Sequence, residues 1–236
     1  MNIIARLNPN HVFNYVCVDE REVSEKTIFF LKPLTVYDYK YCEEVNSDGL
    51  NLKFGNFSFN ILEKGLVGWK NFYYEDNASI PFSIKNFSTV PQNIQAELTQ
   101  ELIRLSDVDE KLTDELIFVA KWSNYVSNLK GKDTWNCDEC MEKKQDRARN
   151  CCNKYPEVGF KKTIGKTPGD TVTSCPISML TSRAVKLTNI INYINDSKSL
   201  PFVGGSLEQT NFFYSARMIV LSERNSMLRQ ELDNQA

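Results

Sequence analysis

The sequence predicts an α+β protein, with strands and helices in its N-terminal part, a cysteine-rich loop segment in the middle and helices in its C-terminal part. Two early segments, residues 12–18 and 27–31, are rich in β-branched and aromatic residues and are separated by a charged stretch, which predicts a hairpin. Residues 131–175 are polar and contain five of the seven cysteines. On both sides of this segment, apolar residues recur at spacings of three and four, as on one face of a helix.

The segment after the hairpin predicts one helix and then a stretch of short strands and turns. Thr35 can accept hydrogen bonds from the first backbone N–H groups of a helix that starts at Val36 and ends before Ser47. Residues 50–90 are rich in aromatic residues, Gly and Asn and have no sustained 3.6-residue period, so no helix is expected there. The aromatic side chains of residues 69–74 fit the core or a contact surface, with the core as the default.

Apolar stripes predict three further helices. The stripes consist of Ile94, Leu98, Leu102 and Leu105; of Leu112, Leu116, Val119, Trp122, Val126 and Leu129; and of Leu180, Ala184, Leu187, Ile191 and Ile194. Gly131 marks the end of the second helix, and Ser206 with Gln209 is a candidate capping box for a last helix. We expect two domains, an α+β domain at 1–130 and a cysteine module with C-terminal helices at 131–236.

The overall composition is that of an ordinary globular protein. A formal net charge of -2 and a pI near 5.6 provide no general attraction to nucleic acid or to an anionic membrane. The N-terminus lacks a signal-peptide pattern, and no apolar stretch approaches the roughly 20 residues of a membrane span. A soluble protein is therefore expected.

The cysteine spacing is the most specific chemical signal. Cys137 and Cys140 are three residues apart, so a tight turn can place both thiolates on one ion, and two cysteines from a distant segment can complete a tetrahedron. This predicts one zinc ion held by Cys137, Cys140, Cys175 and either Cys151 or Cys152. The ion would order a central four-cysteine zinc-stabilised loop module, because the segment has few apolar residues to offset its ordering entropy. Unpaired structural thiols and redox chemistry stay open as alternatives, although no βαβ pattern precedes the CxxC.

No catalytic set stands out, and an enzyme is not expected. Residues 165–170 lack the spacing of a phosphate-binding loop. Gly204 and Gly205 could bind an anion where a helix opens, but a plain turn is the favoured explanation. His11 could act as a general base, although a lone histidine on a strand is usually structural.

The N-terminal stretch, roughly residues 27–107, resembles proteins encoded among the tail genes of tailed bacteriophages. The shared features are a P-L-T segment that enters a helix, a G-L-x-G-W-x-N-F turn at 65–72, an I-P-F segment at 80–82 and a helix introduced by V-P at 90–91. Proteins of this kind are commonly placed with tail assembly chaperones or other tail morphogenesis factors.

The C-terminal stretch is similar to a second phage module, with Cys-Pro, a helix, an L-P-x-x-G-G-x-L-x-Q turn and a final helix, preceded by a CxxC and another cysteine. The matching turn residues are Leu200, Pro201, Gly204, Gly205, Leu207 and Gln209. This resemblance also implies the cysteine set named above as metal ligands.

Together, the resemblances imply a non-enzymatic protein of tail morphogenesis, either an assembly chaperone or a minor tail or baseplate component. Its expected partners are tail-tube, tape-measure or baseplate hub proteins, and self-association is a further expectation. It would act in the host cytoplasm during assembly or reside in the virion tail. The alternative is a zinc-dependent nucleic-acid-binding module, suggested by Lys143, Lys144, Arg147, Arg149, Lys161 and Lys162, which a charge-mixed solvated loop also explains.

Overall fold

The computed structural model describes residues 3–22, 24–48, 51–52, 54–74, 78–128, 135–164 and 170–233. The predicted helix end at Gly131 lies outside these residues, as do residues 165–169. The chain forms two compact units: unit 1 comprises residues 1–108 and 198–215, and unit 2 comprises residues 109–197 and 216–236. The predicted domain boundary lay after residue 130. In the structure the first boundary lies after residue 108, and residues 198–215 belong to the N-terminal unit.

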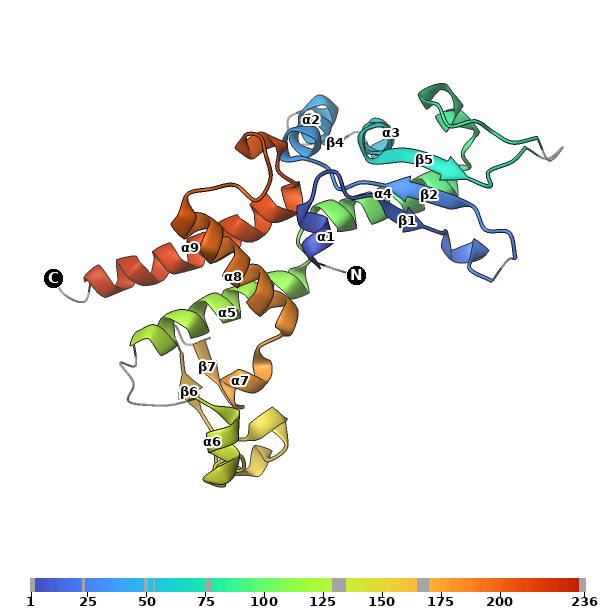
Figure 1. Cartoon of the computed structure of the whole chain (residues 1–236). Coiled ribbons are helices and arrows are strands. Elements are labelled where there is room, and N and C mark those ends of the chain that lie inside the picture. Colours follow the sequence, from blue (N-terminus) through green and yellow to red (C-terminus); the bar gives the residue numbers. More distant parts are fainter. Residues whose placement is uncertain are drawn as a thin grey trace. The chain divides into compact units, whose positions relative to one another are not determined.

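Unit 1 contains an antiparallel sheet with the strand order β1-β2-β5 (Figure 1). β1 (Phe13–Tyr15) pairs with β2 (Ile28–Leu31), which confirms the predicted hairpin. β5 (Leu66–Lys70) pairs with the other edge of β2. Successive strand residues point to opposite faces, so Phe29 and Leu31 share one face, and both are fully buried.

Helices of unit 1 include α1 (Ile3–Leu7), α2 (Val36–Asn46), α3 (Phe54–Gly65) and α4 (Gln92–Ser106). A short pair, β3 (Ser47–Asp48) and β4 (Asn51–Leu52), joins α2 to α3. Both predicted helices are confirmed. The Asp38 N–H donates to Thr35 Oγ1 at 3.1 Å at the start of α2. In the apolar stripe of α4, Leu98, Leu102 and Leu105 are buried and Ile94 is partly buried.

Helix α3 shows that the prediction of strands and turns throughout residues 50–90 was wrong. Phe57, Ile61 and Leu62 lie on one helical face and are all buried, but this stripe is too short to be recognised among the flanking Gly and Asn residues. At the end of α3, a Cβ on Gly65 would overlap the Leu102 side chain of α4, so glycine permits this close approach. The remainder of the segment, with β5 and the 3-10 helix η2 (Ile84–Thr89), contains short elements as predicted.

The aromatic residues at 69–74 divide between core and surface. Trp69 and Phe72 are buried with their ring centroids 5.3 Å apart, and the Trp69 indole N–H donates to the Ile80 carbonyl at 2.7 Å. Tyr73 and Tyr74 are exposed. The default expectation of a core role therefore holds for Trp69 and Phe72 only.

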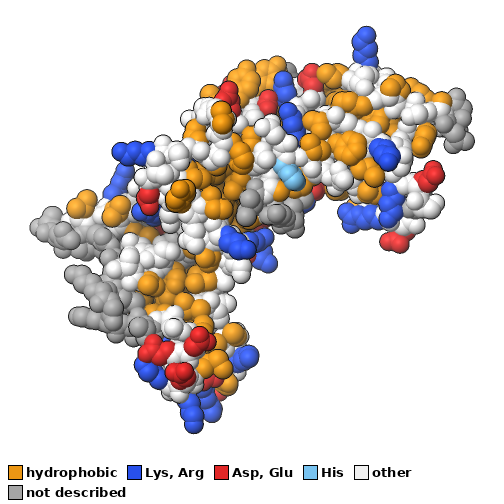
Figure 2. All heavy atoms as spheres, viewed as in Figure 1, with side chains coloured by type: hydrophobic (Ala, Val, Ile, Leu, Met, Phe, Trp, Pro, Cys, Tyr) orange, Lys and Arg blue, Asp and Glu red, His pale blue; other side chains and the backbone are white. Residues whose placement is uncertain are grey.

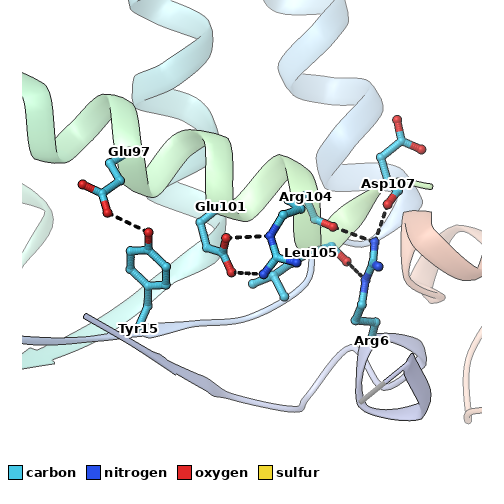
Figure 3. A network of polar contacts seen from close by, with 7 residues as sticks. All are labelled: Arg6, Tyr15, Glu97, Glu101, Arg104, Leu105 and Asp107. Atoms are coloured by element: carbon cyan, nitrogen blue, oxygen red, sulfur yellow. Dashed lines mark hydrogen bonds and ion pairs between the residues drawn. The ribbon is translucent and has the colours of Figure 1, made fainter. Parts of the chain in front are cut away.

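Arg6 closes the C-terminal end of α4 (Figure 3). Its guanidinium donates to the carbonyls of Leu105 at 3.1 Å and Arg104 at 2.6 Å, and also to that of Asp107. These carbonyls belong to the last turn of the helix and its exit, where no further helical N–H is available. The same guanidinium lies 3.6 Å from the ring centroid of Phe212, so the N-terminal helix and residues 198–215 are joined through one buried side chain.

The C-terminal segment of unit 1 pairs with the backbone that enters α2. The Asn211 N–H donates to the Leu34 carbonyl, and the Val36 N–H donates to the Gln209 carbonyl, both at 2.9 Å. The predicted capping box of Ser206 and Gln209 was wrong. Instead, the Glu208 carboxylate accepts from the Gly205 N–H at 2.7 Å. The last helix, α9 (Asn211–Asp233), begins after Thr210, whose hydroxyl accepts from the Phe213 N–H at 3.3 Å.

Gln209 holds the preceding turn together through its side chain. It accepts from the Phe202 N–H at 3.3 Å and donates to the Phe202 carbonyl at 3.1 Å and to the Gly205 carbonyl at 3.3 Å. Gly204 has a φ of 117°, a conformation that glycine adopts without strain.

Unit 2 combines long helices with the cysteine segment. The helices are α5 (Glu110–Asn128), α8 (Ser182–Ser197) and the part of α9 from Ala216 onward. The predicted stripes on α5 and α8 are confirmed in part, since Leu112, Leu116, Leu187 and Ile191 are almost fully buried. Val126 is 41% exposed, Leu180 lies before α8, and Leu129 is outside the described residues. Short elements follow α5: α6 (Cys137–Glu142), η3 (Cys151–Asn153), η4 (Pro156–Val158), β6 (Lys162–Thr163), β7 (Thr171–Val172) and α7 (Pro176–Met179).

The protein is thus an α+β structure of helices and small antiparallel sheets. None of the helices in the described ranges is long and apolar enough to cross a bilayer.

Candidate metal centre

The first two cysteines lie on one short helix, α6. Asn136 precedes it, and its side-chain oxygen accepts from the Asp138 N–H at 2.9 Å, which fixes where the helix begins. Cys137 and Cys140 are three residues apart on this helix, so their side chains point to the same side. Cys140 is buried, whereas Cys137 is exposed.

A left-handed turn positions Cys151. Asn150, Cys152 and Asn153 have φ values of 46°, 54° and 58°, a conformation that Asn tolerates better than most residues. Asn150 is only 2% exposed, and its side chain donates to the Thr173 carbonyl at 2.8 Å and accepts from the Tyr155 N–H at 2.7 Å. This turn is therefore fastened to the segment that leads to Cys175.

Cys175 stands directly before α7. Pro176 occupies the first turn of that helix, where its missing N–H costs nothing, and the Ser178 N–H donates to the Cys175 carbonyl at 3.0 Å. The Cys175 N–H donates in turn to the Asn150 carbonyl at 3.4 Å. The side chain of Cys175 is buried.

These three segments border one small, partly open cavity of about 30 Å³. Its wall includes Cys137, Cys140, Cys151 and Cys175, together with the apolar side chains of Trp135 and Ile177. Cys152 is exposed and is not part of this wall, although its Sγ lies 3.6 Å from that of Cys151. The structure thus brings together four of the five predicted ligands from separate parts of the chain.

The surroundings disfavour the thiolate form of two of these cysteines, Cys137 and Cys151. Burial, followed by the charges of Cys175 and Cys140, raises the pKa of the Cys137 thiol. Burial, followed by the hydrogen bond with Cys152, raises the pKa of Cys151 to about 11. Several thiolates in one small cavity repel one another, and a bound divalent cation would offset this repulsion.

Within the described ranges, no three Cys, His, Asp or Glu side chains stand in a position to hold a metal ion. The four cysteines therefore border one cavity without forming a coordination sphere. The zinc-stabilised loop module remains a prediction.

A small apolar cluster lies behind the cavity. Trp122, Ile164 and Val172 are its buried members, and Trp135 and Ile177 pack against them. The Trp122 and Trp135 rings meet edge to face at 5.3 Å. Trp135 and Ile177 thus form a wall shared by the apolar cluster and the cysteine cavity.

Several basic residues of the module make contacts within unit 2. The Arg149 guanidinium lies 4.4 Å from the Trp135 ring centroid, and the Lys162 ammonium lies 5.6 Å from it. Arg147 pairs with Glu157 at 3.4 Å, and Lys143 pairs with Glu139. Two of these four basic residues thus form ion pairs, and the other two contact the Trp135 ring.

No protein-family model matches the chain, and no curated protein or solved structure is significantly similar to it.

Sequence reasoning missed two residues that shape this centre. Asn150 is buried and connects the Cys151 turn to Cys175, and Trp135 forms a wall of the cavity. The Asn-Cys-Cys-Asn pattern at 150–153 contains a signal for the turn, because Asn is enriched at positive φ. No local pattern marks Trp135.

Proposed function

We propose that this chain is a non-enzymatic protein of bacteriophage tail morphogenesis, which acts by binding other tail proteins. It would serve as an assembly chaperone in the host cytoplasm or as a minor component of the tail or baseplate. The proposal is supported by one observation: in unit 1, the N-terminal stretch that resembles phage tail proteins pairs with residues 198–215, which are part of the second such stretch. Leu34 and Val36 of the first stretch exchange backbone hydrogen bonds with Asn211 and Gln209 in the C-terminal segment.

The surface of unit 1 supports a binding role. Tyr37, Tyr41 and Val45 recur every four residues along α2 and are 60%, 40% and 57% exposed. The two tyrosine rings stack with their centroids 6.4 Å apart. Figure 2 shows that hydrophobic side chains reach the surface on the side displayed. Exposed aromatic side chains are enriched where proteins bind one another, since they bury a large area with few rotatable bonds.

The turn at residues 200–209, which belongs to the second stretch that resembles phage proteins, adds two exposed apolar side chains. Val203 is fully exposed and Leu207 is half exposed, while the backbone of this turn is fixed by Gln209. The 3-10 helix that carries Leu207, η6 (Ser206–Glu208), packs beside α2. A rigid turn that presents apolar side chains loses little entropy when it binds a partner.

A pull-down of the tagged full chain from infected cells tests the proposal. We expect capture of tail-tube, tape-measure or baseplate proteins by the wild type, and loss of this capture in a Tyr37→Ser/Tyr41→Ser double variant. Tyr193→Ser, which changes a 73% exposed tyrosine of unit 2, is the matched control and should retain capture.

Mass spectrometry of purified virions then separates a tail component from a chaperone, because only a component remains in the particle. Recovery with neither tail proteins nor virions would overturn the proposal. Binding of the purified chain to DNA or RNA with a steep salt dependence would instead favour the nucleic-acid alternative.

A further inference from the structure

We infer that unit 2 binds one zinc ion through the sulfurs of Cys137, Cys140, Cys151 and Cys175, and that Cys152 stays outside the coordination sphere. This inference is independent of the proposed role in tail morphogenesis, because it rests on the cysteine cavity alone. It also resolves the choice between Cys151 and Cys152 that the spacing leaves open.

The first argument is convergence. The four cysteines come from α6, η3 and the residue before α7, and all four line one cavity of about 30 Å³. Two other cysteines, Cys17 and Cys42, are buried in unit 1 and take no part. Packing alone does not require thiols from three separate segments to lie at the same small cavity.

The second argument is the chemistry of the donor set. Zinc prefers four tetrahedral ligands in structural sites, and four thiolates are among its commonest sets. The cavity is small enough for an ion, and its remaining wall includes the apolar side chains of Trp135, Met141 and Ile177 beside the polar side chains of Asn136 and Arg149. Asp146 also borders the cavity, but thiolates are the softer ligands and suit zinc better.

The third argument assigns the fourth ligand. Cys151 lines the cavity, whereas its neighbour Cys152 does not. Asn150 fixes this difference: it is buried, donates to the Thr173 carbonyl at 2.8 Å and accepts from the Cys175 N–H at 3.4 Å through its backbone carbonyl. Because both the turn and its attachment to Cys175 are fixed, exchanging the two cysteines would require the left-handed turn to rearrange.

The metal content of matched variants tests the assignment. The full chain is purified without chelators, and bound zinc is measured by mass spectrometry of the element. We expect about one zinc per chain in the wild type and in Cys152→Ser, and well below one in Cys151→Ser and Cys137→Ser. Cys151→His, which supplies another zinc ligand, should restore much of the metal, and this separates lost coordination from failed folding.

Thiol labelling of the wild type provides a test without substitutions. With zinc bound, N-ethylmaleimide should modify Cys152 rapidly and the four ligands slowly, and a chelator should make the ligands reactive. Cys17 and Cys42 serve as internal references for slow labelling that does not depend on metal. Both are buried, and burial raises the pKa of Cys17 to about 12 and that of Cys42 to about 11.

Two results would overturn the inference. Wild-type protein that contains no zinc, and develops no tetrahedral absorption when cobalt is added, would exclude the metal site. Loss of zinc in Cys152→Ser that equals or exceeds the loss in Cys151→Ser would exclude the ligand assignment. Neither result depends on whether the chain captures tail proteins, so the two proposals fail separately.

Discussion

Replacing Arg6 by alanine should destabilise unit 1 more than any replacement of an exposed arginine. The side chain is 7% exposed and donates to three backbone carbonyls at the end of α4 (Figure 3). A hydrogen bond from a charged donor contributes about 1.5–3 kcal/mol, but one side chain makes all three bonds here, so their contributions do not add in full. The stacking on Phe212 contributes about 0.5–2 kcal/mol more. We therefore expect a loss of about 3–4 kcal/mol in the free energy of unfolding.

Arg104→Ala is the matched control. That side chain is 50% exposed and pairs with Glu101 one turn earlier, an arrangement that contributes about 0.5 kcal/mol, and its backbone carbonyl still accepts from Arg6. Urea unfolding, followed by hydrogen exchange of the peptide 92–108, reports on unit 1 separately from unit 2. If Arg6→Ala lowers the stability of this peptide no more than Arg104→Ala does, Arg6 does not hold the end of α4.

Three other outcomes are expected. Hydrogen bonding to Arg183 lowers the pKa of Glu115, so the contribution of the Glu115 carboxylate to stability should be present at neutral pH and disappear as the pH falls through the lowered pKa. The stabilities of wild type and Glu115→Gln should therefore differ at pH 7 and converge at low pH. A difference that stays constant with pH would contradict this. Gly65→Ala should cost about 1–3 kcal/mol by overpacking, whereas Gly205→Ala, with open space around its Cα, should be nearly neutral in thermal unfolding. Removal of metal, or Cys137→Ser, should expose residues 135–153 to protease while α5 and α8 stay protected; equal protection with and without chelator would refute this.

Local patterns in the sequence predicted most of the elements. The hairpin, the start of α2 at Thr35 and the buried stripes of α4, α5 and α8 follow from residue type and spacing over a few turns. Helix α3 was missed because its buried stripe, Phe57 to Leu62, covers less than two turns and is preceded by Gly and Asn. A period cannot be recognised over so short a stretch.

The division into units could not be predicted because it depends on pairing between distant residues. Residues 198–215 join unit 1 through backbone hydrogen bonds to Leu34 and Val36, and no local pattern specifies a partner so far along the chain. The same pairing explains the incorrect capping box. Gln209 directs its side chain back to Phe202 and Gly205, and its carbonyl to Val36, so it is not available to cap the helix that follows.

The cysteine spacing predicted that Cys137, Cys140, Cys175 and one of Cys151 or Cys152 converge, and in the structure Cys137, Cys140, Cys151 and Cys175 border one cavity. Among the described residues of the cysteine segment, Ile164 and Val172 are buried against Trp122 of α5, so apolar contacts hold this half of the segment to the long helices. The other half runs from α6 to the Asn150 turn, residues 137–153. Cys140 is the one apolar side chain that is buried among these described residues. Ordering the backbone costs about 1–2 kcal/mol per residue, which so little burial does not offset. Hydrogen bonds such as those of Asn150 stabilise this half, and the metal that we infer at the four sulfurs would add to them.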